Sequence, residues 1–154
     1  MTYTYKKAEL EDIDTLVKTR IEVLRAANRL GNDTDMFLVE KNSRQYYEEA
    51  LQSDMHRAYL VYDGEKIIGA GGISFFQVMP TSHNPTGWKA YIMNMYTNPS
   101  YRRQGIAYHM LELLTGEAEK KGIRHISLEA TDMGRALYER YGFVKMNDEM
   151  ELPV

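Results

Sequence analysis

The chain has 154 residues, a length that fits one domain with a buried core. Its 19 basic and 22 acidic side chains give a net charge of −3, which disfavours a nucleic-acid partner. The sequence contains no cysteine, which excludes a cysteine acyl-enzyme, and its four histidines lack metal-ligand spacing, so we expect no metal site. Because no long apolar run or apolar signal core is present, we expect no membrane contact and a cytoplasmic location.

The N-terminal third of the chain predicts one strand and two helices. Residues 2–8 alternate in polarity as a strand does, and the acidic residues that follow suit the first turn of a helix. Arg20 falls on the apolar stripe of that helix, which is unusual for a charged side chain. A second helix is predicted to begin near Asn42 and Ser43, with Gln45 placed for a capping role.

The middle of the chain predicts a hairpin and a further strand. Residues 57–62 and 67–78 are predicted to form two strands, and Asp63-Gly64 between them is a strong turn signal. Residues 79–87 contain two prolines and predict a loop, after which residues 88–97 predict a strand.

The last third predicts a helix that ends at Gly122, a strand over residues 125–130, a short helix over 133–141 and a final strand pair over 143–152. Strands and helices mixed in this order indicate an α/β or α+β fold, in which helices cover a central sheet. We expect a single domain over residues 1–154.

A glycine-containing turn, Arg102–Ala107 (Arg-Arg-Gln-Gly-Ile-Ala), joins the strand at 88–97 to the helix that follows it. The first N–H groups of a helix lack intrahelical partners and meet the positive end of the helix dipole, so such a turn suits phosphate. Gly105 lets the backbone approach a ligand closely. An ordinary solvated helix cap has the same appearance.

Two segments carry a resemblance to a known family. The pattern Arg-x-x-Gly-x-Ala resembles the pyrophosphate-binding loop of the GNAT superfamily of N-acetyltransferases, which holds coenzyme A. Ala136–Phe143 resembles the Ala-x-x-Tyr-x-x-x-Gly-Phe ending of that family, with the small residue displaced by one position. The order of elements is also similar to the GNAT fold, which implies a mixed, mostly antiparallel sheet flanked by about four helices.

The resemblance implies acetyl-CoA as cosubstrate and a set of backbone contacts to it. Backbone N–H groups just before Asn98-Pro99 would face the acetyl carbonyl, and the turn would hold the pyrophosphate, with Arg103 adding charge. The residues implied are Met95, Tyr96 and Thr97 for the acetyl group, and Arg103, Gln104, Gly105, Ile106, Ala107 and Tyr108 for the pyrophosphate.

The resemblance also supplies two catalytic candidates. Tyr138 stands where the family has the tyrosine that protonates the leaving thiolate, and a phenol with a pKa of about 10 stays protonated for this task. A packed aromatic on an amphipathic helix is the alternative for Tyr138. Glu129 is the candidate base, with a salt-bridged or edge-exposed glutamate as the alternative. Asn94, where other members carry a carboxylate, cannot act as a base.

These observations lead to the hypothesis of an N-acetyltransferase that moves an acetyl group from acetyl-CoA directly to a primary amine of a small molecule or peptide. Arg20 would either bind a substrate carboxylate or pair inside the protein. The alternative function is a non-catalytic acyl-CoA-binding sensor or interaction module. A homodimer is permitted by the apolar residues Val144, Met146, Met150 and Leu152, which also fit an ordinary intrachain sheet. The acceptor side implied by the resemblance comprises Arg20, Arg25, Tyr46, Tyr47 and the loop 79–88.

Overall fold

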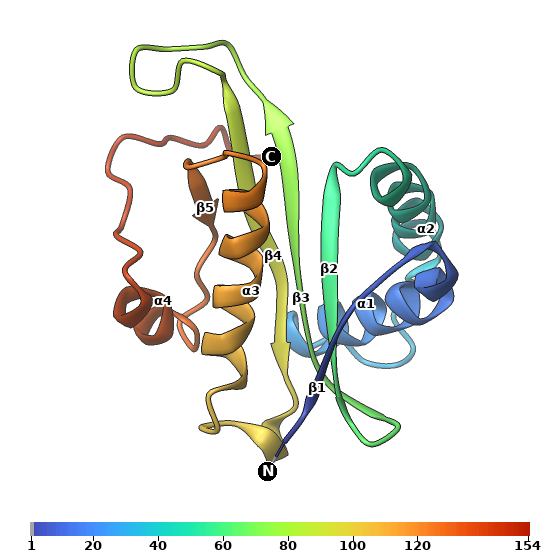
Figure 1. Cartoon of the computed structure of the whole chain (residues 1–154). Coiled ribbons are helices and arrows are strands. Elements are labelled where there is room, and N and C mark those ends of the chain that lie inside the picture. The colour runs from blue at the N-terminus through green and yellow to red at the C-terminus, as the bar shows by residue number, and fades with distance from the viewer. Residues whose placement is uncertain (1) are drawn as a thin grey trace.

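The computed structural model describes residues 2–154 and shows one five-stranded sheet with helices on both faces (Figure 1). The strands lie side by side in chain order, and each neighbouring pair is antiparallel except β4 and β5, which are parallel. The elements are β1 (Thr4–Lys7), η1 (Leu10–Asp12), α1 (Ile13–Ala27), α2 (Phe37–Gln52), β2 (His56–Asp63), β3 (Lys66–Gln77), β4 (Trp88–Thr97), η2 (Pro99–Tyr101), α3 (Ile106–Lys120), β5 (Ile126–Leu128) and α4 (Arg135–Tyr141). This architecture confirms the predicted fold class.

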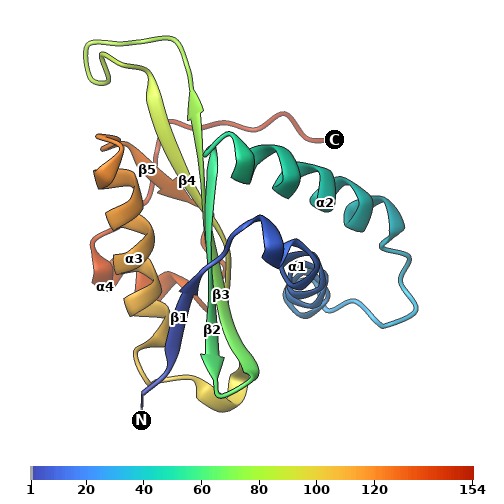
Figure 2. The same cartoon turned by 45° about the vertical axis from the view of Figure 1, so that its right-hand side comes forward.

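Helices α3 and α4 cover one face of the sheet, and α1 and α2 cover the other (Figure 2). The core beneath α3 is the larger of the two and is continuous from β2 to β5. Its fully buried members alternate along the strands, because successive strand residues point to opposite faces. They include Val61, Ile73 and Ile92 of the sheet and Met110, Leu111 and Leu114 of α3.

The β3–β4 ladder contains a bulge that bears on the site. Ala70 pairs with Tyr96 and Gly72 pairs with Met93, so two residues of β4 stand opposite the single residue Gly71. One of those two residues is Asn94, whose φ of 57° lies in the left-handed region that non-glycine residues rarely adopt. Such a bulge bends and twists its strand, and here it redirects the second half of β4.

The β4–β5 ladder is short. It comprises the pairs Ala90–Ile126, Tyr91–Ser127 and Ile92–Leu128, and β4 continues for five further residues without β5 beside it. The bulge and the end of this ladder fall at adjacent positions. The two strands therefore separate midway along β4, where backbone groups of β4 become available to a ligand.

Two sequence predictions of secondary structure are wrong. Helix α2 begins at Phe37, earlier than the predicted Asn42. The Asp35 carboxylate accepts a hydrogen bond from the Phe37 N–H at 2.9 Å and so satisfies one of the first backbone donors of the helix. Residues 143–152 form no strand pair. The apolar alternation there is suited to a strand, but a strand also needs a hydrogen-bonding partner, and Val144, Met150 and Leu152 remain exposed.

Candidate active site

The turn between η2 and α3 has a backbone shaped for an anion. Arg103 and Gly105 have φ values of 63° and 82°, so two left-handed residues flank Gln104 directly before the helix. The first α-helical bond of α3 runs from the His109 N–H to the Gly105 carbonyl at 3.0 Å. The preceding N–H groups of Ile106, Ala107 and Tyr108 therefore lack intrahelical acceptors and form a concave donor surface.

The space in front of this turn is open. A Cβ added at Gly105 would have no heavy atom within 4 Å, so a ligand can approach the backbone here without displacing protein. Arg103 and Gln104 are exposed, and Gln104 accepts a hydrogen bond from the Tyr3 hydroxyl at 2.5 Å, which connects the turn to the start of the sheet. The dipole of the fifteen-residue helix α3 adds to the attraction for an anion.

Met95, Tyr96 and Thr97 lie on the part of β4 that continues beyond β5, between the bulge and the turn. The side chains of Met95 and Tyr96 pack on opposite faces of the sheet, Met95 against the α3 core and Tyr96 against the α1 core. Their side chains thus serve packing, while the backbone edge toward β5 is the part without a strand partner. The predicted acetyl-facing and pyrophosphate-facing residues therefore lie on either side of the short η2 segment that joins β4 to α3.

Tyr138 lies on α4 with only 9% of its surface exposed, packed into the α3 core. Its ring contacts Phe143 edge-on at 6.2 Å, and it lies so close to Gly134 that a Cβ there would be 2.9 Å from the ring. Burial raises the pKa of the Tyr138 phenol, which keeps it protonated at neutral pH. These contacts suit both a proton donor and a packed aromatic.

Glu129 follows the last residue of β5 and is exposed. The predicted strand over 125–130 is shorter than expected, at 126–128, and Glu129 therefore stands beyond the strand instead of within it. Burial raises the pKa of the neighbouring Tyr91, and the Glu129 charge raises it further. Tyr91 belongs to β4 and pairs with Ser127, so Glu129 lies on the β5 side of the point where the strands separate.

A buried polar cluster on the α1–α2 face was missed by the sequence interpretation. His56 begins β2 and pairs in register with Ser74 of β3, and its Nδ1 is 2.9 Å from Ser74 Oγ and 3.0 Å from the Tyr46 hydroxyl. The Tyr46 hydroxyl and Ser74 Oγ are 2.6 Å apart. His56 is 3% exposed and its Nε2 has no partner. One sequence signal could have revealed the cluster: His56 and Ser74 are polar residues on the two strands that the Asp63-Gly64 turn joins.

Burial, together with the nearby Arg20 charge, lowers the pKa of His56 from 6.5 to about 4. His56 is therefore neutral at physiological pH. Arg20 is half-buried on α1 and donates from Nη1 to the Asn94 side-chain oxygen at 3.1 Å. Arg20, the charged residue in the apolar stripe of α1, therefore contacts the bulge of β4.

Comparison with known proteins identifies the family. The profile of the acetyltransferase (GNAT) family matches residues 23–143. The chain belongs to this family. The GNAT membership predicted from the two sequence segments is thereby confirmed, and with it the enzyme class, that of the acetyl-CoA-dependent acyltransferases.

Relatives of known structure extend this result. A predicted acetyltransferase from Clostridium acetobutylicum, whose crystal structure contains acetyl-CoA, is 34% identical and covers 99% of this chain and 96% of its own, with a TM-score of 0.89. A GCN5-related N-acetyltransferase from Ralstonia eutropha is 22% identical, with 99% of both chains covered and a TM-score of 0.83, and it shares the fold.

A relative among curated proteins is the uncharacterized N-acetyltransferase YsnE of Bacillus subtilis. It is 32% identical over 100 residues, a region that includes 62% of this chain. The matched region spans 60% of the length of that relative. Within residues 2–154 of the present chain, every helix is too short or too polar to cross a membrane.

Proposed function

We propose that this GNAT member transfers an acetyl group from acetyl-CoA directly to a primary amine of a small molecule or peptide. The observation that carries the proposal is the turn at Arg103–Gly105, whose two left-handed residues and open front adjoin the free edge of β4. The Clostridium acetobutylicum relative that contains acetyl-CoA supports it. The cytoplasmic location expected from the sequence stays a prediction.

The residues present fit acetyl-CoA. Its pyrophosphate requires several N–H donors and no opposing carboxylate, and the exposed turn before α3 provides the unpaired N–H groups of Ile106, Ala107 and Tyr108. Arg103 would add a positive charge. The backbone of Met95, Tyr96 and Thr97 would donate to the acetyl carbonyl, because this edge of β4 has no β5 residue opposite it. Bound there, acetyl-CoA supplies an activated thioester.

Two side chains would then move protons. Tyr138 would give its phenolic proton to the departing thiolate, and its raised pKa ensures that the proton is present at neutral pH. The acceptor amine must lose a proton to become a nucleophile, since an alkyl ammonium has a pKa near ~10.4. Glu129 is proposed as the acceptor of that proton; its exposed position beyond β5 allows it to act through water.

Calorimetric titration with acetyl-CoA tests the cofactor site. Gly105→Glu places a side chain and a negative charge where the pyrophosphate would lie, and we expect it to abolish binding. Gly122→Glu is the matched control, because Gly122 also has a positive φ (72°) and open space around it but stands at the other end of α3. Equal affinities for the native chain and both variants would refute the site.

Turnover of Tyr138→Phe tests the proposed acid. We expect acetyl-CoA affinity to be retained and kcat to fall by about 10²-fold or more, the usual contribution of a general acid. An unchanged kcat would assign Tyr138 to packing alone. The alternative function, a non-catalytic acyl-CoA-binding module, would show binding that depends on Gly105 and no transfer to any amine, peptide or antibiotic of a broad panel.

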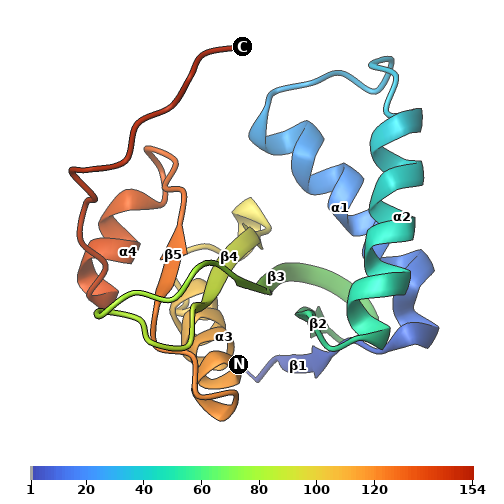
Figure 3. The ribbon, with the colours of Figure 1, turned by 90° about the horizontal axis from the view of Figure 1, so that it is seen from above.

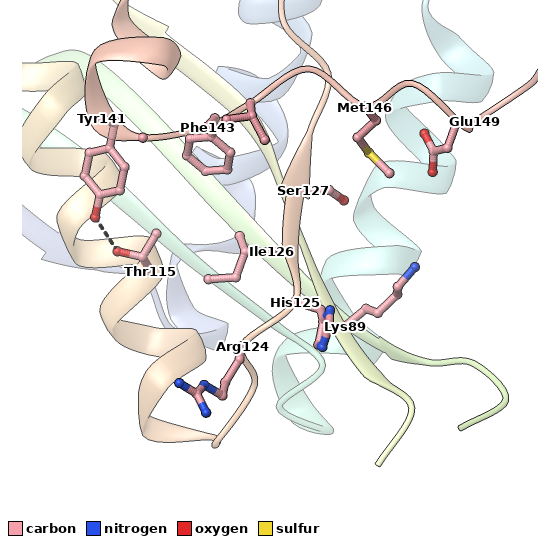
Figure 4. A pocket seen from close by; sticks show the side chains of 12 residues that line it. Lys89, Thr115, Arg124, His125, Ile126, Ser127, Tyr141, Phe143, Met146 and Glu149 are labelled. Carbon is pink, nitrogen blue, oxygen red and sulfur yellow. Dashed lines mark hydrogen bonds between the residues drawn. The ribbon is translucent and has the colours of Figure 1, made fainter. Parts of the chain in front are cut away.

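We also propose that two copies of the chain associate through residues 143–154. A cavity of about 530 Å³ lies between β5 and this segment, and its wall includes Arg124, His125, Ile126 and Val144 (Figure 4). The cavity is lined in part by β5. β5 is an edge strand of the sheet, as the view from above shows (Figure 3). Apolar and acidic side chains alternate in the exposed run from Glu149 to Leu152. In a dimer, the apolar side chains of one copy would enter the cavity of the other, and the acidic ones would face Arg124 there.

Light scattering tests this association. Met150→Asp with Leu152→Asp should convert a dimer to a monomer, because both side chains are more than nine-tenths exposed in the single chain and gain burial only in a pair. Met79→Asp, in the exposed loop after β3, is the control for adding charge at an exposed methionine. A native chain that stays monomeric at high concentration would contradict the proposal.

A further inference from the structure

Arg20 has an unbalanced charge in a half-buried place. Its position on α1 turns it toward the sheet, where it contacts Asn94 of β4. Asn94 is a neutral amide, so this hydrogen bond orients the guanidinium without neutralising it. The ion pairs formed within residues 2–154 do not include Arg20. A half-buried cation without a counter-charge carries a desolvation cost that an anionic ligand would offset.

The surroundings of Arg20 reinforce this reading. Arg20 lies close enough to Tyr47 and His56 for its charge to act on both: burial raises the pKa of Tyr47 to about 12 against the lowering effect of Arg20, and His56 is kept neutral. The two side chains that hydrogen-bond with His56, Tyr46 and Ser74, carry uncharged hydroxyls. A guanidinium has several N–H donors in a planar fork, and Asn94 accepts one of them, so donors remain for a carboxylate or phosphate.

The hydrogen bond between Arg20 and Asn94 indicates where Arg20 lies relative to the proposed acetyl site. Asn94 is at the bulge of β4, and the next residue along the strand is Met95, the first of the three proposed to face the acetyl group. Because Arg20 donates to the Asn94 side chain and Asn94 directly precedes Met95, an anion held by Arg20 would lie near this part of β4. An amine separated from that anion by one or two carbon atoms would therefore reach the acetyl group.

We propose that the acceptor is a small amine that carries a carboxylate or phosphate close to its amino group, and that Arg20 binds this anionic group. The inference rests on the proposed acetyl transfer and adds the acceptor class to it. An α-amino acid is the simplest molecule with the required spacing. A polycationic acceptor is disfavoured, because it would bring further positive charge against Arg20.

Matched pairs of acceptors test the class directly. Each α-amino acid of a panel is compared with its own carboxamide, and phosphoethanolamine is compared with ethanolamine, while release of the CoA thiol is followed at saturating acetyl-CoA. We expect the anionic member of the preferred pair to have a kcat/KM at least about tenfold higher, the value of one charge-assisted hydrogen-bonded contact. Which of the two pair types shows the preference distinguishes carboxylate from phosphate.

Variants of α1 assign the preference to Arg20. Arg20→Gln should raise KM for the anionic acceptor with little change in kcat and should bring the ratio within a pair close to one. Arg20→Lys should restore part of the preference, because it restores the charge but not the fork. Lys18→Gln removes a positive charge from an exposed position of the same helix and should leave the ratio unchanged. A ratio that persists in Arg20→Gln, or a native preference for the neutral members, overturns the inference.

Binding experiments keep this inference separate from the proposed function. Calorimetric titration of the same matched pairs into the native chain and into Arg20→Gln requires no turnover. If acetyl-CoA binds and neutral amines are acetylated best, the transferase proposal holds and the acceptor class is wrong. If acetyl-CoA fails to bind, the transferase proposal fails, and stronger binding of the anionic members by the native chain alone would still support the anion site. Equal binding of both members by both proteins would exclude it.

Discussion

The two faces of the sheet are built from different chemistry. The face beneath α3 is a continuous apolar core in which Ile73, Met110 and Leu114 are fully buried. The face beneath α1 and α2 has a smaller apolar core and also a polar part, in which His56 of β2 contacts Ser74 of β3 and Arg20 of α1 contacts Asn94 of β4. A sheet of alternating residues presents both faces at once, so one set of strands supports both environments.

The difference indicates a division of tasks. Apolar burial is the main source of folding free energy, and the α3 face concentrates it. Buried polar groups cost free energy unless they are paired, and among residues 2–154 the side-chain atom His56 Nε2, on the α1–α2 face, is buried without a partner. We infer that the α3 face stabilises the fold and that the polar part of the other face recognises the acceptor. Four predictions test this comparison.

The largest expected effect is on the apolar face. Leu114→Ala should lower the free energy of unfolding by about 2–5 kcal/mol, because the side chain is fully buried and the core around it cannot collapse into the cavity. Urea denaturation measures the change. Leu10→Ala, at an exposed leucine before α1, should have an effect below about 0.5 kcal/mol. Similar losses in the two variants would contradict the assignment of the α3 face.

The next effect is a pH dependence on the polar face. The pKa of His56 is lowered from 6.5 to about 4 on folding, so the unfolded chain binds more protons between these pH values. The stability is therefore fully present above pH 6.5 and falls toward acid with a slope of up to about 1.4 kcal/mol per pH unit. Unfolding measured from pH 7 to pH 5 should show this slope in the native chain.

Two variants isolate the contribution of His56. His56→Asn should flatten the slope between pH 7 and pH 5, and His83→Asn, at an exposed histidine, should keep it. The buried Glu117 has a pKa lowered on balance by hydrogen bonds to Lys7 and Lys120 despite its burial, so its contribution is lost only at a more acidic pH. A slope that survives in His56→Asn would show that the titration of another group causes it.

Gly71 and Gly72 are adjacent in β3 and face opposite sides of the sheet, so variants at these positions compare the two faces directly. A Cβ at Gly71 would lie 2.5 Å from Met110 Cγ, and a Cβ at Gly72 would lie 2.8 Å from His56 Nε2. Each alanine variant should cost about 1–3 kcal/mol through overpacking, with the smaller loss at Gly71, because a methionine side chain adapts and a hydrogen-bonded imidazole does not. Thermal unfolding of both variants gives the order, and a reversed order would refute this explanation.

The smallest effect is expected for Tyr46→Phe, which removes one hydroxyl from the polar cluster. Tyr46 is partly exposed and water can replace its hydrogen bonds to His56 and Ser74, so the loss should be about 1 kcal/mol. Tyr62→Phe, a half-buried tyrosine near the other end of the sheet, serves as the comparison. A loss as large as that of Leu114→Ala would make the polar cluster a principal source of stability.

Local sequence signals predicted most of the elements. The hairpin joined at Asp63-Gly64, the strand Trp88–Thr97 and the helix that ends before Gly122 were predicted within one or two residues, because turn residues and periodicity act locally. The glycine-containing turn before α3 was predicted for the same reason, and its binding of an anion stays a prediction. The roles of Tyr138 and Glu129 stay predictions, since the resemblance and not the local pattern supplied them.

The sequence predictions failed where the structure depends on pairing between residues that are distant in the sequence. Residues 143–152 have the alternation of a strand, yet they form none here, because a strand exists only with a neighbour to accept its hydrogen bonds. His56 and Ser74 are eighteen residues apart in the sequence, and only the β2–β3 register brings them together.

The amino-acid sequence by itself therefore determined the order of the elements, the glycine turn before α3 and the family resemblance, all of which depend on neighbours along the chain. Only the tertiary structure decided that Arg20 stands over Asn94 at the bulge of β4, that His56 is buried and neutral, and that β4 separates from β5 beside the turn. The physical reason is that charge, burial and strand pairing are set by contacts between distant residues, and those contacts exist only once the chain has folded.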